Sequence, residues 1–273
     1  MMVLLFEREI RPYFEYRQPP SYRTLLCRKT EPERELRSIF FGKERVGQAE
    51  RLLVPVAGTG YVLRSRVAMD LRLMMPAAVA GDTQTWMASE AVVDEDFRLR
   101  QFESRGGLRG LNFTVRGTRE GRKLRVAYDL LLFSGVQEVE FPPDAALSDY
   151  FLPFEGGGRL GEGKKWKSRM LDLDNLVSLQ GKREVTFTEV YAVVVGREVV
   201  RALGHDRYAF KVEIRRDPTQ VLPSYTLWVD DQGIVLRQEM KIQRLVCQVL
   251  LEERERVAPE KAAAYPWRVP LPR

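Results

Sequence analysis

Histidine and cysteine are nearly absent from this chain, and their scarcity argues against whole classes of site. The single histidine, His205, leaves no HExxH zinc motif and no histidine cluster. The two cysteines, Cys27 and Cys247, stand near opposite ends of the sequence, and no CxxC pair is present. A structural zinc site is therefore not expected, and isolated thiols are the simplest interpretation, with a disulfide between the two as the alternative.

The sequence also lacks the motifs that carry common enzyme chemistry. His205 falls in an expected turn, and no GxSxG elbow accompanies it. In the glycine-rich segment 155–165, Lys165 stands where a phosphate loop needs serine or threonine, and a strand is expected to follow it. Carboxylate pairs such as Asp94 and Asp96 lie in turns, where turn chemistry explains them. We expect no catalytic residue, no cofactor, no metal and no enzyme activity.

Long hydrophobic runs are missing as well. The most apolar stretch, Met1–Phe6, has six residues, whereas a membrane-spanning helix needs about 20. It is also shorter than the core of about 7–15 residues in a signal peptide, and no basic lead precedes it. The sequence as written predicts a soluble protein, unless Met1–Phe6 is the end of an anchor that begins further upstream.

Charge is distributed without blocks of one sign. Lys and Arg number 44 against 38 for Asp and Glu, which gives a net charge of +6 and a pI near 9.3. This balance favours weak attraction to anionic partners, including peripheral association with a membrane surface. No run of five like charges and no RRM-type motif occurs, so nucleic acid is not an expected partner. A solvated surface with a mild arginine excess is the simpler interpretation.

What the sequence does contain is alternation with a period of two, most clearly over residues 60–75. Arg64, Arg66, Asp70 and Arg72 fall on one side of the repeat. The apolar side is interrupted only by Ser65 and consists of Tyr61, Leu63, Val67, Met69, Leu71, Leu73 and Met75. This pattern predicts a long strand with one wet face and one buried face. Similar strands recur to about residue 250, which predicts an all-β protein with one large antiparallel sheet.

Composition shifts along the chain predict three regions. Residues 1–33, broken by prolines, form an extended or short-helical appendage, with a short helix over 3–10. Residues 34–251 form the curved β domain, and residues 252–273 form a loose tail. Within the β domain we expect a first meander over 34–141, a helix and Gly-rich linker over 142–164, and a second meander over 165–251. The helix spans 144–152, with Asp144 as its cap.

Glycine and aspartate mark the expected turns within the sheet. Gly42 with Lys43 predicts a two-residue hairpin, and the segment 230–233 predicts a second hairpin. Gly47 lies inside a strand pattern and predicts a bulge or the close approach of another backbone. Gly196 is expected to join two strands, and the Gly106-Gly107 pair is expected to end one.

Four segments support a resemblance to a known family: residues 37–50, 163–166, 195–199 and 227–235. They resemble turns and strands of uncharacterised bacterial envelope proteins, which are similar in pattern to the outer-membrane lipoprotein carrier superfamily. The resemblance covers roughly residues 36–250. It implies a half-barrel, here of about eleven strands, with a helix against its concave side and an apolar ligand bound there. It also implies a location on the periplasmic side of the cell envelope, although no lipobox is present at Cys27.

The apolar side of the sheet is the remaining candidate for function. We expect a non-enzymatic binding or scaffold protein that holds a lipid-like or other apolar ligand on a concave face. The residues expected on that face are Tyr61, Leu63, Val67, Met69, Leu71, Leu73, Met75, Leu147 and Phe151. An ordinary core, covered by the 144–152 helix, the N-terminal segment and loops, explains the same pattern. The alternative function is an accessory subunit of a larger envelope assembly, with protein contacts through the N-terminal segment and edge strands.

Overall fold

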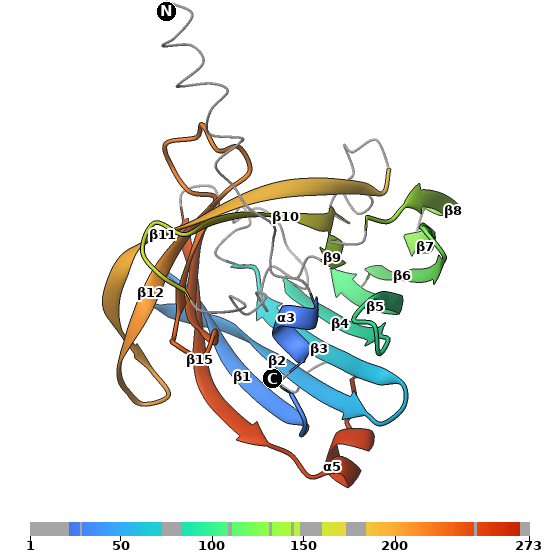
Figure 1. Cartoon of the computed structure of the whole chain (residues 1–273), viewed down its shortest axis with the longest axis horizontal. Helices are drawn as coiled ribbons and strands as arrows, with labels where there is room; N and C mark the ends of the chain where they lie inside the picture. The colour runs from blue at the N-terminus through green and yellow to red at the C-terminus, as the bar shows by residue number, and fades with distance from the viewer. Residues whose placement is uncertain are drawn as a thin grey trace, which may run out of the picture.

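The computed structural model describes residues 22–27, 29–72, 83–108, 111–130, 133–142, 145–147, 160–172, 184–242 and 245–267. Within these ranges fifteen strands form one sheet. The helices are α3 (Tyr22–Leu26) and α5 (Pro259–Ala263). The predicted fold class is confirmed, because the sheet is single, almost wholly antiparallel, curved and not closed into a barrel (Figure 1).

The strands of the first half leave the centre of the sheet in sequence order. They are β1 (Glu33–Phe41), β2 (Glu44–Val56), β3 (Gly60–Asp70), β4 (Gln84–Val93), β5 (Leu99–Leu108), β6 (Leu111–Glu120), β7 (Lys123–Leu130) and β8 (Phe133–Glu140). The second half begins at the opposite edge. It comprises β9 (Ala145–Leu147), β10 (Lys165–Asp172), β11 (Thr186–Ala202), β12 (His205–Arg215), β13 (Tyr225–Val229), β14 (Val235–Ile242) and β15 (Leu245–Arg256).

The strand order explains how one chain makes so wide a sheet. The order is β8-β7-β6-β5-β4-β3-β2-β1-β15-β14-β13-β12-β11-β10-β9, so the first and last long strands pair at the centre. Every pair is antiparallel except β9 with β10, which is parallel. The chain therefore meanders to one edge, crosses to the other, and meanders back.

The two edges of the curled sheet meet through side chains. One core cluster combines Leu124 and Val126 of β7 with Leu171 of β10 and with Val185, which precedes β11. The backbone N–H of Val185 also donates to Oε1 of Gln137 on β8, at 2.9 Å. Figure 1 shows α3 inside this curve, in front of β2 and β3. Packing, rather than a backbone ladder between β8 and β9, brings the ends of the sheet together in the described structure.

The predicted helix over 144–152 is wrong where the structure describes it. Ala145–Leu147 forms β9, and its backbone pairs with residues 169–171 of β10. Local apolar spacing suits a helix there, but the exposed edge of β10 supplies backbone partners that a short isolated helix would not have. Residues 148–152, and the helix expected over 3–10, lie outside the described residues. The helix that packs on the inner face is α3.

Both predicted hairpins are confirmed, and so are the bulge and the close approach of another backbone predicted for Gly47. Gly42 and Lys43 form the turn between β1 and β2. In the second hairpin the carboxylate of Asp230 accepts the backbone N–H groups of Gln232 and Ile234, each at 2.9 Å. Gly47 follows a bulge, and a Cβ added to it would lie 2.3 Å from the carbonyl oxygen of Ala68.

Two expected interruptions turn out to be continuous strand. The chain passes through Gly106 and Gly107 within β5, because the Phe113 ring of β6 occupies the space over Gly106. β11 continues through Gly196, with a bulge between Val194 and Gly196, so the expected junction there is wrong. The turn comes at Gly204, whose φ of +79° suits glycine. The described sheet nevertheless has fifteen strands, which is more than the predicted number of about eleven.

The face of β3 expected to be wet is partly covered by the C-terminal segment. Arg66 is buried, and its guanidinium donates to the hydroxyl of Tyr265 at 3.2 Å. Arg64 donates to the carbonyl of Ala262 at 2.9 Å. Ala262 and Trp267 are themselves buried. The expectation of a loose tail is thus wrong for residues 259–267, which form a second layer on this face.

Candidate functional site

The structure distributes the predicted ligand-face residues over two core clusters of the inner face. Tyr61, Leu63 and Leu147 pack against the cluster where the sheet ends meet, which we call the junction core. Val67, Met69 and Leu71 pack in a neighbouring cluster, the central core, together with Ile39, Phe41, Val46, Ala49, Met240, Cys247 and Val249. Leu73, Met75 and Phe151 lie outside the described residues.

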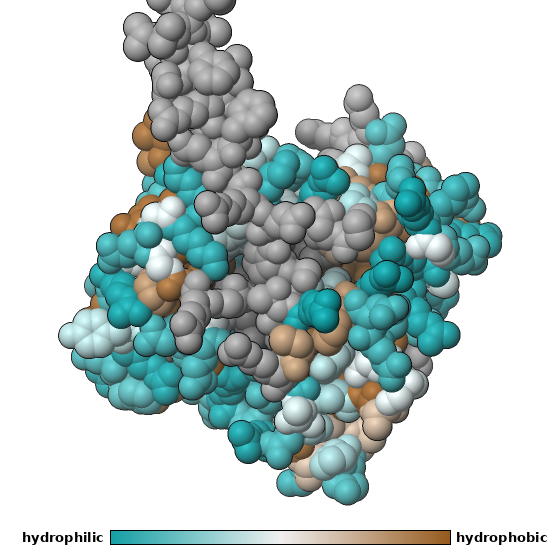
Figure 2. Space-filling view, viewed as in Figure 1, coloured by the Kyte–Doolittle hydropathy of each residue, from teal (hydrophilic) through white to brown (hydrophobic). Residues whose placement is uncertain are grey.

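The junction core is surrounded by large apolar side chains that remain partly exposed. These residues, which we call the junction rim, are Tyr61, Leu63, Phe97, Phe113, Tyr128, Leu130, Val139, Leu147 and Phe187. The rings of Tyr61 and Phe97 stack with centroids 5.7 Å apart. Phe187 meets the buried Phe141 edge to face, with centroids 5.5 Å apart. In Figure 2 apolar surface is visible on the side where β5–β8 lie, framed by hydrophilic residues.

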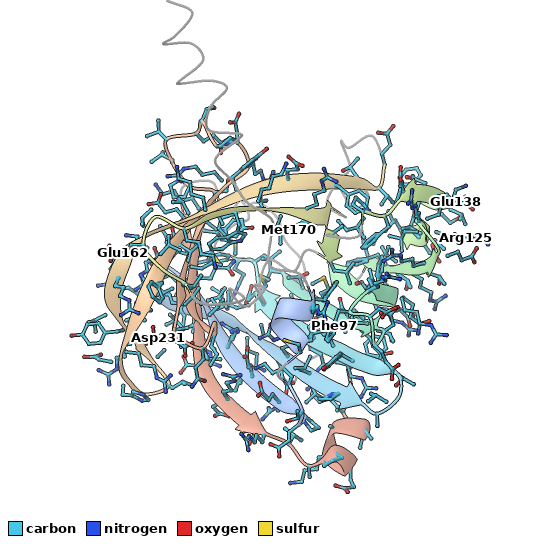
Figure 3. The ribbon with its side chains drawn as sticks, viewed as in Figure 1. Phe97, Arg125, Glu138, Glu162, Met170 and Asp231 are labelled. Carbon is cyan, nitrogen blue, oxygen red and sulfur yellow. The ribbon has the colours of Figure 1, made fainter. Side chains whose placement is uncertain are left out.

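Helix α3 covers part of this region through a small number of contacts. Its Tyr22 and Leu26 are buried in the junction core. The hydroxyl of Tyr22 accepts the backbone N–H of Leu147 at 3.2 Å, which links α3 to β9. Burial raises the pKa of Tyr22 to about 12, so the hydroxyl stays neutral. The guanidinium of Arg23 lies 6.0 Å from the ring centroid of Phe97, which Figure 3 shows beside α3.

A row of polar side chains separates the junction core from the central core. Residues directly opposite each other in an antiparallel ladder share a face of the sheet. The successive pairs of β15, β1, β2, β3, β4 and β5 place six polar side chains in one line across the inner face. This polar row is Arg254, Glu35, Arg51, Ser65, Ser89 and Ser104.

Three guanidinium groups surround the one carboxylate of the polar row. Glu35, only 3% exposed, accepts from Arg37 at 2.8 Å and from Arg51 at 3.0 Å, and Nε of Arg254 lies 3.7 Å away. Burial alone would raise the pKa of Glu35, but the charges of Arg51 and Arg37 outweigh it and lower the pKa to about 2. The carboxylate is therefore ionised at neutral pH.

The serine end of the polar row is less completely satisfied. Ser65 is 9% exposed, and its hydroxyl makes no hydrogen bond to any group in the described part of the chain. The hydroxyls of Ser89 and Ser104 lie 2.9 Å apart and bond to each other. Both serines and the neighbouring Leu63 are half-buried, so solvent reaches this part of the inner face.

Other kinds of site receive no support from the described residues. They contain no group of three His, Cys, Asp or Glu side chains placed to hold a metal ion. Cys27 is exposed and Cys247 buried, and both are free thiols. His205 sits at its hairpin tip with Nδ1 beside the carbonyl of Leu203 and Nε2 beside Arg207. No helix in the described ranges is both long and apolar enough to cross a membrane.

Comparisons with known proteins define the class of fold. A crystal structure of a β-barrel-like protein of the domain of unknown function DUF1849, from Brucella abortus, superposes with a TM-score of 0.52. The match has 11% identity and covers 84% of this chain and 98% of that one. A DUF1089 family protein from Pseudomonas aeruginosa gives a TM-score of only 0.33 at 12% identity, over 81% of this chain and 90% of that one. No family model and no curated protein matches the sequence.

This chain is a β-rich protein with a β-barrel-like fold, similar over most of its length to a protein whose function is unknown. At this level of identity the similarity extends to the fold alone. Any role must therefore be argued from the inner face itself.

Proposed function

We propose that this protein is a non-enzymatic binding protein that holds a lipid-like apolar ligand between α3 and the inner face of the sheet. The junction rim carries this proposal. Nine large apolar side chains, five of them aromatic, stay partly exposed around a core that both ends of the sheet share. Leaving apolar surface in water costs about 25 cal/mol per Å², which an apolar ligand in contact with the rim would recover.

Two further features support the proposal. The inner face is contributed by strands from both halves of the chain, so that the concave side is enclosed without a backbone ladder between β8 and β9 in the described sheet. Entry of a ligand between these two edges of the sheet would disrupt side-chain contacts but no backbone ladder. The resemblance of the turn and strand motifs to lipoprotein carriers points to the same ligand class. The net charge of +6 would favour loading at an anionic membrane surface.

The proposal is tested with the neutral apolar probe 1-N-phenylnaphthylamine, whose fluorescence rises on transfer from water. We expect saturable binding by the purified protein after delipidation, and a co-purified apolar ligand in native mass spectra before it. Replacing the stacked pair, Tyr61→Ala with Phe97→Ala, should weaken probe binding about tenfold, since the change removes two aromatic rings, each a large apolar contact, from the rim. Tyr208→Ala removes an aromatic that is 74% exposed and serves as the matched control. Absence of saturable binding, or equal binding by all three proteins, would overturn the proposal.

A second candidate function is an accessory subunit that binds a protein partner along the edge strand β8. Edge strands present unpaired backbone groups to which another chain can add. β8 also carries Phe133 and Val136 as exposed apolar residues. Under this alternative Val136→Lys would abolish co-purification of the partner and leave probe binding unchanged. A wild-type protein that elutes as a monomer from its native extract would count against it.

A further inference from the structure

Ser65, which interrupts the apolar run of β3, belongs to the polar row that crosses the inner face. The polar row crosses six strands, with the junction core on one side and the central core on the other. Along β3, Ser65 lies two residues from Leu63 and four from Tyr61, both of the junction rim. At about 3.3 Å per residue, the hydroxyl of Ser65 stands roughly 13 Å from the far end of that apolar stretch.

Ser65 provides the observation that separates this row from an ordinary structural network. The residue as a whole is 9% exposed, its side chain lies on the inner face, and its hydroxyl forms no hydrogen bond within the described part of the chain. The hydroxyl is not among the fully buried side-chain atoms that lack a partner, so water can reach it, and an oxygen of a ligand can take the place of that water. The half-buried Ser89 and Ser104 next to it keep this position open to solvent. The row therefore offers a polar group to something that is not part of the protein.

The charge around the row selects the kind of group it can receive. At its arginine end four cations share two carboxylates in ion pairs: the cations are Lys29, Arg37, Arg51 and Arg254, and the carboxylates are Glu33 and Glu35. Arg51 is the direct cross-strand neighbour of Ser65. A guanidinium carries five donors in a planar fork that matches the oxygens of a carboxylate or phosphate. An anionic head group beside Ser65 would meet both a hydroxyl and a positive field.

We propose that the ligand is an anionic amphiphile: its carboxylate or phosphate binds at Ser65 and Arg51, and its apolar chain lies along the junction rim. This inference rests on the proposed function and adds to it the chemical class of the ligand and the direction in which it binds. The apolar chain of the ligand follows β3 from Ser65 toward Leu63 and Tyr61, and its head group remains at the polar row. No covalent step is involved.

A pair of probes with identical chains separates the two proposals. Cis-parinaric acid carries a carboxylate and fluoresces when bound, and its methyl ester is the neutral equivalent. For the delipidated wild-type protein at neutral pH we expect the acid to bind about tenfold more tightly than the ester, the effect of one charge-assisted hydrogen-bonded contact. Binding of neither probe would overturn both proposals. Equal binding of acid and ester would overturn the anionic class and leave the proposed function standing.

Substitutions then locate the head group. Ser65→Ala should reduce the preference for the acid about threefold, and Arg51→Gln should abolish it, while ester affinity stays within about twofold in both. Ser134→Ala, at an exposed serine of β8, is the matched control. Ser65→Ala removes one atom, so it remains informative even if Arg51→Gln fails to fold. A preference for the acid that survives Ser65→Ala in full would contradict the assignment.

Competition distinguishes the two anionic chemistries. Oleate and oleoyl lysophosphatidate have the same chain, and each is added to the complex of the protein with parinaric acid. Stronger displacement by the phosphate compound would identify a phosphate-bearing ligand, and stronger displacement by oleate a carboxylate. Displacement by neither compound would contradict the proposal.

Discussion

Arg66 is the buried one of two arginines that link β3 to the C-terminal segment, and Arg64 is the other. Arg66 donates to the carboxylate of Glu50, which is 2% exposed, and to the carbonyl of Pro266 at 3.3 Å. Its guanidinium also lies 4.7 Å from the ring centroid of Tyr265. Burial would raise the pKa of Glu50, but hydrogen bonds from Arg66 and Arg34 outweigh it and lower that pKa. Arg66 therefore joins a buried charge to the layer that covers it.

Arg66→Met keeps most of the side-chain volume and removes the charge. It leaves Glu50 with Arg34, whose side chain is about a third exposed and so compensates less. Removing one partner of a buried pair costs about 3–5 kcal/mol, because the other charge stays buried. We expect a loss of stability in this range. Glu50→Gln combined with Arg66→Met should cost at least about 2 kcal/mol less than the sum of the single changes.

Urea unfolding followed by circular dichroism and tryptophan fluorescence measures these differences. Trp267 lies in the covering segment, so its fluorescence should shift in Arg66→Met before the main transition. Arg116→Met is the matched control, since Arg116 pairs with Glu103 at 3.0 Å but is 61% exposed, and should cost under about 1 kcal/mol. Equal losses in Arg66→Met and Arg116→Met, or strict additivity in the double variant, would refute the reasoning.

Two further predictions concern the sheet itself. Gly47→Ala should destabilise the protein by about 1–3 kcal/mol in urea unfolding, because the new Cβ meets the backbone of Ala68, whereas Gly196→Ala, with nothing within 4 Å, should be close to neutral. The pKa of Glu35 is lowered to about 2 from an ordinary 4.5, chiefly by Arg51 and Arg37 against the cost of burial. Its contribution is therefore complete above pH 4.5 and lost as pH falls toward 2. Glu35→Gln should flatten this part of the stability–pH curve, and an unchanged curve would contradict the assignment.

Much of the fold could be predicted from local pattern. Alternation identifies strands such as β3, and turn residues locate the hairpins at Gly42 and at Asp230. The failures have a shared cause, which is that partners distant in sequence decide the outcome. Ala145–Leu147 becomes a strand because β10 offers its edge. Gly106 stays within a strand because a neighbouring aromatic ring occupies the space that a side chain would take.

The candidate site was only partly predictable for the same reason. The apolar residues of β3 could be assigned to one face from their spacing, and Tyr61 and Leu63 do lie at the junction rim. The joining of both sheet edges, and the role of Tyr22 from α3, depend on curvature that no local pattern encodes. The alternating pattern places Arg66 on the polar face of β3 and therefore predicts that it is solvated. The pattern does not reveal that the C-terminal segment covers this face and buries Arg66.

The polar row illustrates how register turns a minor sequence irregularity into a structural feature. Ser65 interrupts an apolar run, and alone it means little. The ladder places it beside Arg51 on one side and Ser89 on the other, in line with the buried Glu35. Burying ions is costly, and well-packed apolar residues of similar volume are often at least as stabilising. Stability alone therefore gives little reason to hold charges and a hydroxyl without a protein partner between two apolar clusters, whereas the ligand proposed above, half apolar and half charged, would use both parts of this arrangement.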